Sequence, residues 1–501
     1  MDNKNIFICG ADTQFVQETF KKVVKSSNSK IMGVLVSNFQ KTIDDKFKCE
    51  QIIEQDLFKN SFFLSKISSY NLEIDIEFLK KIKKFFHLFA SSYDRIQPIP
   101  NTIYNLNNIF QKQIIFFKNF IEINKINEVF FINTPHYPSA ISIYIVAKLL
   151  NVNTIIQQRT DIDSLFFLRK DLDNFSTLYQ IDNENIALKK HIEKYFKDNN
   201  THSTFTSLGI KKNNLIINLF NSKLFKYFTI TKNIFIILYS DLFLRLFGIR
   251  QNDINTSSVM GNYYENNLKI ALIKIKRIFD SFNLYKYLCA ISVKPKLDEN
   301  YLLFALHFQP ERSTMPEGGI FNDQILALKL LSQNIPDNLI IYVKEHPRQF
   351  DIFPQLSKIH YRNKEYYNEI NNIPRVKILH PFQNLENLIS NAKFISTITG
   401  SLGIEAIKKN KPCIIFSHTW YMKHPLSFIA NHSKDLQNIF LNTSNLNIPK
   451  STHDKFINYI NKHLFFSSDG KLNINKNKNN LNTYSDNLSN ELIKIYTNKY
   501  K

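Results

Sequence analysis

The chain has 501 residues, of which 44% are hydrophobic and 21% are charged. This composition excludes an intrinsically disordered protein, and the length exceeds what one hydrophobic core usually supports, so we expect at least two domains. Lys and Arg outnumber Asp and Glu by 64 to 43, and the formal net charge of +21 favours a polyanionic partner such as nucleic acid, anionic lipid or acidic polysaccharide.

Two βαβ patterns are predicted in the first third of the chain. Apolar runs at 5–9 and 31–37 indicate buried strands with a helix-length segment between them. A strand, a helix and another strand are predicted at 129–133, 140–150 and 153–157. Repeated βαβ units are typical of a parallel sheet, so a Rossmann-like domain is expected here.

The middle of the chain is predicted to be helical and irregular. Its most apolar run, 233–247, is broken by Asp241 and Arg245, which favours a buried helix over an interfacial one. No run of 18 uninterrupted apolar residues is present, and the first residues do not resemble a signal peptide. We therefore expect a cytoplasmic chain without a membrane span. Four separated cysteines fit reduced core residues: Cys9, Cys49, Cys289 and Cys413.

Strands and helices alternate regularly from residue 301 onward. The strands are predicted at 301–306, 338–343, 376–379, 394–398 and 412–416. Helical patterns separate them, and this alternation predicts a doubly wound parallel sheet. The expected domains are a Rossmann-like domain, a helical connecting region, a second Rossmann-like domain and C-terminal helices with a polar tail: 1–170, 171–296, 297–430 and 431–501. Two such domains suggest a cleft between them.

Polar residues gather directly after the strand predicted at 301–306. In an open parallel sheet, ligands bind beyond the carboxyl ends of the strands. The candidates here are His307, Gln309, Glu311, Ser313, Gly318 and Gly319. The paired glycines allow a positive φ or a close backbone approach to a ligand, and Glu311 is a candidate for acid–base chemistry or for binding a sugar hydroxyl. Bracing of the loop is the structural alternative.

Two further strand ends carry polar groups. Lys344 adds positive charge, and Pro347 holds His346 at the mouth of its strand, where imidazole can donate to a phosphate or protonate a leaving group. The later turn comprises Ser396, Thr397, Thr399, Gly400 and Ser401. Ser401 is the predicted helix N-cap beside a phosphate, and Glu405 would accept hydrogen bonds from ribose hydroxyls. Taken singly, an ordinary loop histidine, a simple cap and a solvated carboxylate explain these residues.

Three motifs in this order resemble the bacterial capsular polysaccharide synthesis glycosyltransferases, which include transferases for Kdo and related acidic sugars. The motifs are HFQPERSTMPEGGIFNDQ, IPDNLIIYVKEHPRQF and ISTITGSLGIEAIKKNKPCIIF, and the resemblance covers about 301–421. It implies a GT-B architecture and a nucleotide-activated donor, with 1–170 as the acceptor-side domain and 297–430 as the nucleotide-sugar-binding domain. The KEHP element resembles the HP motif that contacts the nucleotide phosphate in transferases that use CMP-sugars, which implies that His346 contacts phosphate beside the Ser/Thr-rich turn.

The general base is left open by this resemblance, because the paired acidic residues of sialyltransferases have no clear counterpart in the first half. Candidates at strand ends of the first domain are Asp12, His136, Asp161 and Asp163. Asp161 and Asp163 have the spacing of a metal-binding Asp-x-Asp but lie in the presumed acceptor half. We therefore expect no obligatory metal and no other cofactor.

The sequence thus favours a metal-independent glycosyltransferase that moves an acidic sugar from a CMP-activated donor to a glycan or lipid-linked glycan, at the inner face of the cytoplasmic membrane. A nucleotide-sugar 2-epimerase on the same scaffold is the first alternative. An RNA-binding protein is disfavoured because RNP-like strands and a GXXG loop are missing, so no nucleic-acid partner is expected. A non-catalytic capsule-assembly protein is the third alternative.

Overall fold

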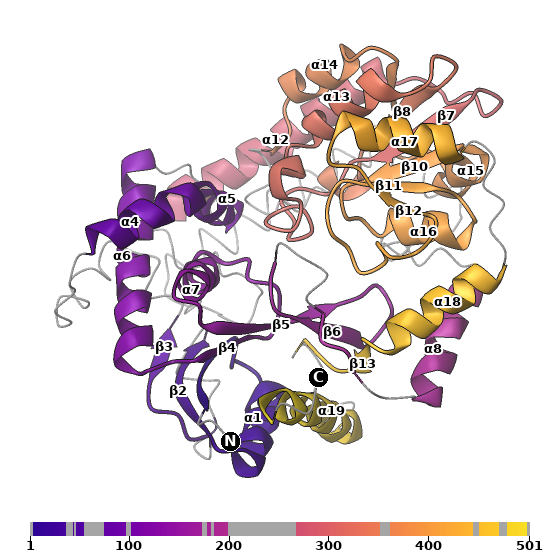
Figure 1. Ribbon diagram of the computed structural model, residues 1–501. Coiled ribbons are helices and arrows are strands. Elements are labelled where there is room, and N and C mark those ends of the chain that lie inside the picture. The colour runs from indigo at the N-terminus through magenta and orange to yellow at the C-terminus, as the bar shows by residue number, and fades with distance from the viewer. Residues whose placement is uncertain are drawn as a thin grey trace. The chain divides into compact units, whose positions relative to one another are not determined.

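The computed structural model describes residues 4–36, 44, 47–54, 75–96, 102–172, 178–181, 185–198, 267–350, 361–443, 450–469 and 478–497. The chain divides into two units (Figure 1). Unit 1 comprises Met1–Asp94, Ile99–Tyr195 and His453–Lys501, and unit 2 comprises Arg95–Pro98 and Phe196–Thr452. Much of the predicted connecting region, including 233–247, lies outside the described residues.

Unit 1 is built on a seven-stranded sheet in the order β13-β6-β5-β4-β1-β2-β3. The strands are β1 (Lys4–Cys9), β2 (Ser29–Val36), β3 (Ile52–Glu54), β4 (Glu128–Phe131), β5 (Asn153–Arg159), β6 (Leu165–Arg169) and β13 (Phe465–Phe466). From β5 to β3 all pairings are parallel, whereas β6 and β13 add an antiparallel edge. The order 3-2-1-4-5 of the parallel strands is that of a Rossmann fold.

Helices cover both faces of this sheet because the side chains of its central strands alternate between two cores. Phe7 and Cys9 pack with residues of α6 and α7, while Ile6 and Ile8 pack with α1 and α19. The α-helices that belong wholly or mainly to unit 1 are α1 (Gln14–Ser26), α4 (Ile76–Ile82), α5 (Phe86–Ile96), α6 (Ile103–Ile123), α7 (Pro138–Leu149), α8 (Ile186–Lys197), α18 (Lys450–Asn461) and α19 (Lys478–Tyr496).

The C-terminal segment completes unit 1, although the sequence analysis placed 431–501 in one separate region. Helix α19 packs against α1, where Lys22 Nζ lies 2.7 Å from Asp486 Oδ1 and 2.8 Å from Ser485 Oγ. Strand β13 pairs with β6. The boundary of the structure therefore falls between Thr452 and His453.

Unit 2 is built on a six-stranded, all-parallel sheet in the order β12-β11-β10-β7-β8-β9. The strands are β7 (Tyr301–Ala305), β8 (Ile340–Lys344), β9 (Val376–Leu379), β10 (Phe394–Thr397), β11 (Cys413–Ile415) and β12 (Ser427–Ile429). The first five agree with the predicted strands to within two residues. The sixth, β12, is short and half-buried, and the periodicity of the sequence did not predict it.

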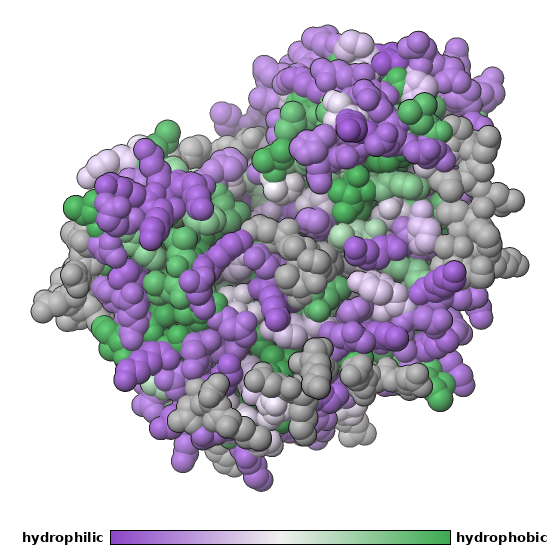
Figure 2. All heavy atoms as spheres, in the orientation of Figure 1, coloured by the Kyte–Doolittle hydropathy of each residue, from purple (hydrophilic) through white to green (hydrophobic). Residues whose placement is uncertain are grey.

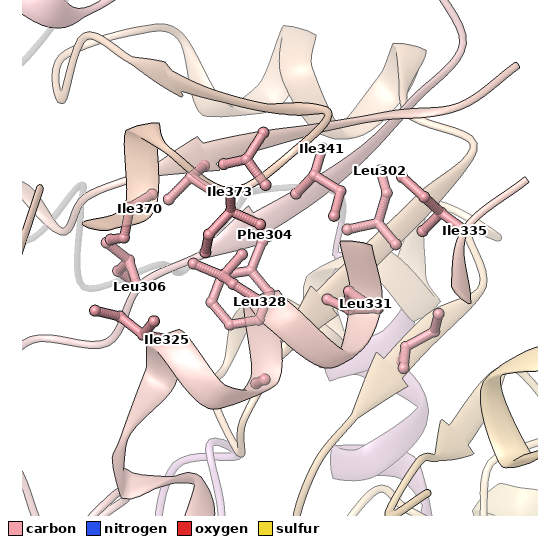
Figure 3. Packing of buried hydrophobic residues seen from close by; sticks show 14 of the residues in the cluster. Leu302, Phe304, Leu306, Ile325, Leu328, Leu331, Ile335, Ile341, Ile370 and Ile373 are labelled. Atoms are coloured by element: carbon pink, nitrogen blue, oxygen red, sulfur yellow. The ribbon is translucent and has the colours of Figure 1, made fainter. Parts of the chain in front are cut away.

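The α-helices of unit 2 are α12 (Asn267–Ile291), α13 (Gln324–Asn334), α14 (Lys364–Asn371), α15 (Leu385–Asn391), α16 (Leu402–Lys408) and α17 (Ser433–Thr443). Figure 3 shows how Leu328 and Leu331 of α13 pack against Leu302 and Phe304 of β7. Hydrophilic residues predominate on the displayed face of the molecule (Figure 2). This distribution is what helices produce when they bury one apolar side.

The two Rossmann-like α/β units confirm the predicted fold class. In both sheets the strand order reverses beside the first strand, between β1 and β4 in unit 1 and between β7 and β10 in unit 2. Such a switch point is where open α/β sheets bind ligands. The predicted cleft between domains stays a prediction. Within the described ranges, no helix combines the length and apolar character needed to cross a bilayer.

Glu128, the first residue of β4, is an acidic side chain fully buried in unit 1. Asn153 Nδ2 donates to both of its carboxylate oxygens, at 2.9 and 2.8 Å, and Lys4 Nζ lies 3.8 Å away. Burial nevertheless raises the pKa of Glu128 from 4.5 to about 7. Between these values the folded chain holds a proton that the unfolded chain has released, so stability should fall as the pH rises through this window.

We predict that Glu128→Gln flattens the dependence of Tm on pH between pH 5 and 8, because the amide stays neutral in both states. The wild type should lose up to about 3 kcal/mol across this window. Tm measured by circular dichroism checks the prediction, with the exposed Glu122→Gln of α6 as control. Equal pH slopes for Glu128→Gln and the wild type would contradict it.

Candidate functional site at the switch point of unit 2

The site is built where β7 and β10 end side by side. His307 follows β7, and its Nε2 lies 2.9 Å from Thr397 Oγ1 at the end of β10. The backbone N–H of Thr399 donates to the same Nε2 at 3.3 Å. Thr399 Oγ1 donates in turn to the carbonyl oxygen of Ser313 at 2.5 Å. The first and third predicted strand ends, 90 residues apart in sequence, therefore form one polar cluster.

The loop after β7 runs outward from a buried base. His307, Gln309 and Thr314 are buried, Ser313 is half-buried and Glu311 is exposed. Burial and the nearby charge of Arg362 lower the pKa of His307 to about 3, so its imidazole is neutral at physiological pH. The other ring nitrogen, Nδ1, lies 3.3 Å from Ser313 Oγ. A histidine held in this way supports the loop from within.

The loop after β8 is joined to the loop after β7. Gln349 pairs with the backbone of Gln309 in both directions: its Oε1 accepts from Gln309 N at 2.9 Å, and its Nε2 donates to Gln309 O at 3.1 Å. The rings of Phe308 and His346 lie 5.7 Å apart. The second predicted strand end therefore adjoins the first, with the half-buried His346 beside it.

A buried ion pair fixes this junction. Arg362 Nε lies 2.6 Å from Glu345 Oε2, and both side chains are almost fully excluded from solvent, at 3% and 0% exposure. Tyr367 donates to the same carboxylate oxygen at 2.9 Å, and the backbone N–H of His346 donates to the other at 2.8 Å. Arg362 Nη2 also donates to the carbonyl oxygen of His307 at 3.0 Å. This buried pair thereby fixes the backbone of both His307 and His346.

The environment of Lys344 differs from the predicted one, in which this residue adds positive charge at the strand end. Its side chain is buried, and its amino group donates to the carbonyl oxygen of Pro381, in the loop after β9, at 2.7 Å. Burial lowers the pKa of Lys344 to about 7, against the opposing effect of Glu345. Lys344, the last residue of β8, therefore bonds to the backbone of the loop after β9.

The turn after β10 also departs from the prediction. Ser401 lies at the N-cap of α16 but has αR backbone angles, and its side chain makes no capping hydrogen bond. The predicted N-cap position is therefore confirmed, but its side-chain hydrogen bond is not formed: a capping serine normally has an extended backbone, and this one is already helical. Glu405 is buried in the first turn of α16, and Ser396 is buried within β10. Both side chains are therefore shielded from solvent, whereas the structural alternative for Glu405 was a solvated carboxylate.

A fourth loop, residues 417–424 after β11, belongs to the same edge and was missed by the sequence analysis. Ser417 Oγ donates to the carbonyl oxygen of Glu317 at 2.5 Å, and the Tyr421 hydroxyl donates to the carbonyl oxygen of Gly400. A Cβ atom at Gly403 would lie 2.2 Å from the Tyr421 oxygen. Only glycine at position 403 leaves room for the Tyr421 ring. The spacing of residues in one sequence does not reveal such a contact.

The two neighbouring glycines of the β7 loop have separate purposes. Gly319 has a φ of +56°, which glycine adopts without strain. Gly318 is packed so closely that a Cβ atom there would lie 2.7 Å from the carbonyl oxygen of Thr314. Both requirements come from the turn itself, so the pair shapes the loop that carries Glu311 and Ser313.

The acceptor-side candidates lie in unit 1. Asp12 follows β1, and His136 follows β4, where its Nδ1 donates to the carbonyl oxygen of Thr134 at 2.6 Å. Asp161 is exposed after β5, and the 85% exposed Asp163 lies 3.7 Å from Arg159. Asp12 and His136 therefore lie at the switch point of unit 1, between β1 and β4. Across the described part of the chain, no group of three His, Cys, Asp or Glu residues is arranged to hold a metal ion.

Residues 314–437 match the family described as capsule polysaccharide biosynthesis protein. This match contains His346, Thr399 and Ser401, and it confirms the resemblance recognised from the motifs. It covers about a quarter of the chain, namely α13 to α17 of unit 2. No curated protein matches the sequence.

Two solved structures illustrate the similarity to known proteins. UDP-GlcNAc 2-epimerase from Methanocaldococcus jannaschii is 12% identical, covers 92% of this chain and 99% of its own, and has a TM-score of 0.25. The beta Kdo 2,7 transferase KpsC of Thermosulfurimonas dismutans is 14% identical, covers 46% of this chain and 66% of its own, and has a TM-score of 0.24. Neither similarity establishes which reaction this chain catalyses.

We predict that Arg362→Leu lowers the free energy of unfolding by about 3–5 kcal/mol, because it leaves the Glu345 carboxylate buried without its cation. Urea unfolding measures this change. Lys329→Met, which removes the exposed pair with Glu369 on the same unit, serves as the matched control and should have little effect. Equal losses of stability in the two variants would contradict the prediction.

Proposed function

We propose that the chain is a glycosyltransferase that moves a sugar from a nucleotide-activated donor to a glycan acceptor in capsule polysaccharide biosynthesis. The observation that carries this proposal is the junction of the loops after β7, β8 and β10 at the switch point of unit 2. Hydrogen bonds between the loops and the buried Glu345–Arg362 pair hold this junction in place. The family match over 314–437 supports its assignment to capsule biosynthesis.

His346 is the proposed contact for the donor phosphate. Its ring is half-buried beside Phe308, while its backbone N–H is anchored on Glu345. The anchored backbone keeps His346 at the strand end, and a histidine can donate to a phosphate oxygen as negative charge builds on the leaving nucleotide. The turn that contains Thr399, Gly400 and Ser401 completes the proposed donor side.

The proposed reaction needs a base as well as a phosphate contact. An acceptor hydroxyl attacks the anomeric carbon, the bond from that carbon to the phosphate oxygen breaks, and the nucleotide departs with the electron pair. Glu311 lies exposed on the same loop as His307 and is the base that we favour on the donor unit. Asp161 and Asp163 are its proposed alternatives in unit 1, with Asp12 and His136 beside the acceptor.

The finer assignments follow from the motif resemblance and the charge of the chain. A CMP-activated acidic sugar such as Kdo or sialic acid is the favoured donor, transfer is metal-independent, and the architecture is GT-B. The formal charge of +21 suits an acidic glycan or lipid-linked glycan and peripheral contact with the anionic inner face of the cytoplasmic membrane.

Nucleotide release tests the reaction directly. Purified protein is incubated with CMP-Kdo or CMP-sialic acid, with and without a capsular glycan fragment. If the chain is a transferase, CMP release and glycan extension should both require the CMP-sugar and the glycan fragment together. Conversion of UDP-GlcNAc to its 2-epimer without any acceptor would establish the epimerase alternative in place of the transferase.

We predict that CMP raises Tm more than UDP, GDP or ADP does, and that His346→Ala removes most of this rise. A ligand at one hundred times its Kd stabilises the folded chain by about 2.7 kcal/mol, so loss of the phosphate contact should be visible by thermal shift. His432→Ala is the control, since His432 is exposed on the same unit. Selective stabilisation by UDP would contradict the preference for CMP, and an unchanged shift in His346→Ala would remove this histidine from the site.

A further inference from the structure

We propose that His307 and Ser313 are positioning residues, which hold the Glu311 carboxylate as the general base through one hydrogen-bond chain. This inference rests on the proposed glycosyl transfer and deepens it, because it selects one base among the candidates. It also changes the expected role of His307 and Ser313, which the sequence analysis placed among groups that contact the donor.

The donors and acceptors of this hydrogen-bond chain have a defined direction. A backbone N–H can only donate, so the bond from Thr399 N to His307 Nε2, at 3.3 Å, requires an unprotonated Nε2. In the neutral imidazole the proton therefore resides on Nδ1, which donates to Ser313 Oγ at 3.3 Å. The Ser313 hydroxyl is then directed to its other partner, Glu311 Oε2, at 2.9 Å. Each step fixes the next, from the buried switch point to the exposed carboxylate.

The buried end of this hydrogen-bond chain, at His307, is rigid. Thr397 Oγ1 lies 2.9 Å from the same Nε2, and the backbone N–H of Gly400 donates to this hydroxyl oxygen at 3.2 Å. A Cβ atom at Gly400 would lie 3.1 Å from His307 Cε1, which shows how tightly the ring is enclosed. Thr399 Oγ1 also holds the Ser313 backbone. The imidazole cannot turn without breaking contacts with both strand ends.

The exposed end of this hydrogen-bond chain, at Glu311, is suited to proton transfer. The carboxylate of Glu311 takes the proton of the attacking hydroxyl as the new bond to the anomeric carbon forms, and later releases it to solvent. The Ser313 hydroxyl stabilises the charged form of Glu311 and thereby keeps it able to accept a proton. The same loop carries the Arg312–Glu317 pair, and Arg362 of the buried pair with Glu345 donates to the carbonyl oxygen of His307 at 3.0 Å.

The test compares Ser313→Ala with Ser313→Thr. Loss of a hydrogen bond to a charged carboxylate should lower kcat about tenfold and raise the pKa of the acidic limb of the kcat profile, with an unchanged KM for the donor. Threonine keeps the hydroxyl and should restore both values, whereas Glu311→Gln should lower kcat about a hundredfold or more. Ser390→Ala, an exposed serine of α15, is the control for the loss of a hydroxyl elsewhere on unit 2.

A second measurement is independent of turnover. In histidine-selective ¹⁵N NMR, the signal absent from His307→Gln should show the Nδ1–H tautomer and no titration above pH 5. Titration of this signal near neutral pH, or an unaltered kcat profile in Ser313→Ala, would overturn the positioning role. These results differ from a failure of the proposed function, in which the wild type would transfer no sugar and no nucleotide would raise its Tm.

Discussion

The Glu345–Arg362 ion pair is the interaction on which the candidate site depends. It is almost completely shielded from water, where an isolated charge would be very unfavourable, and its further hydrogen bonds go to the Tyr367 hydroxyl and to the backbone of His307, His346 and Tyr361. Both histidines follow directly after neighbouring strands. A buried pair of this kind specifies one loop geometry, because alternatives would leave a charge unpaired.

The strand order explains why this geometry occurs where it does. The strand order reverses between β7 and β10, so the ends of these two neighbouring strands meet at the switch point. His307 bridges these two ends with its ring, and Gln349 joins the loop after β8 to the same region. The site is therefore a consequence of topology, refined by a few buried polar side chains.

Much of unit 2 could be predicted because several of its strands are continuous apolar runs, as in Tyr301–Ala305 and Cys413–Ile415. The strand-end rule also identified His307, His346 and Thr399. What could not be predicted depends on tertiary contacts: Arg362 is an ordinary charged residue in sequence, and only folding places it on Glu345. The same holds for Ser401, whose backbone geometry overrides a common capping preference, and for Tyr421, whose partner is a distant carbonyl.

The return of the C-terminal segment to unit 1 has a consequence for biosynthesis. Residues of β13 and α19 complete a sheet and a core that begin with β1, so the ribosome must make all of unit 2 before the first domain can close. Unit 2, apart from a four-residue segment, is continuous in sequence and can mature as it emerges. The nascent N-terminal half therefore keeps the apolar surface that receives α19 uncovered until the C-terminal segment has been synthesised.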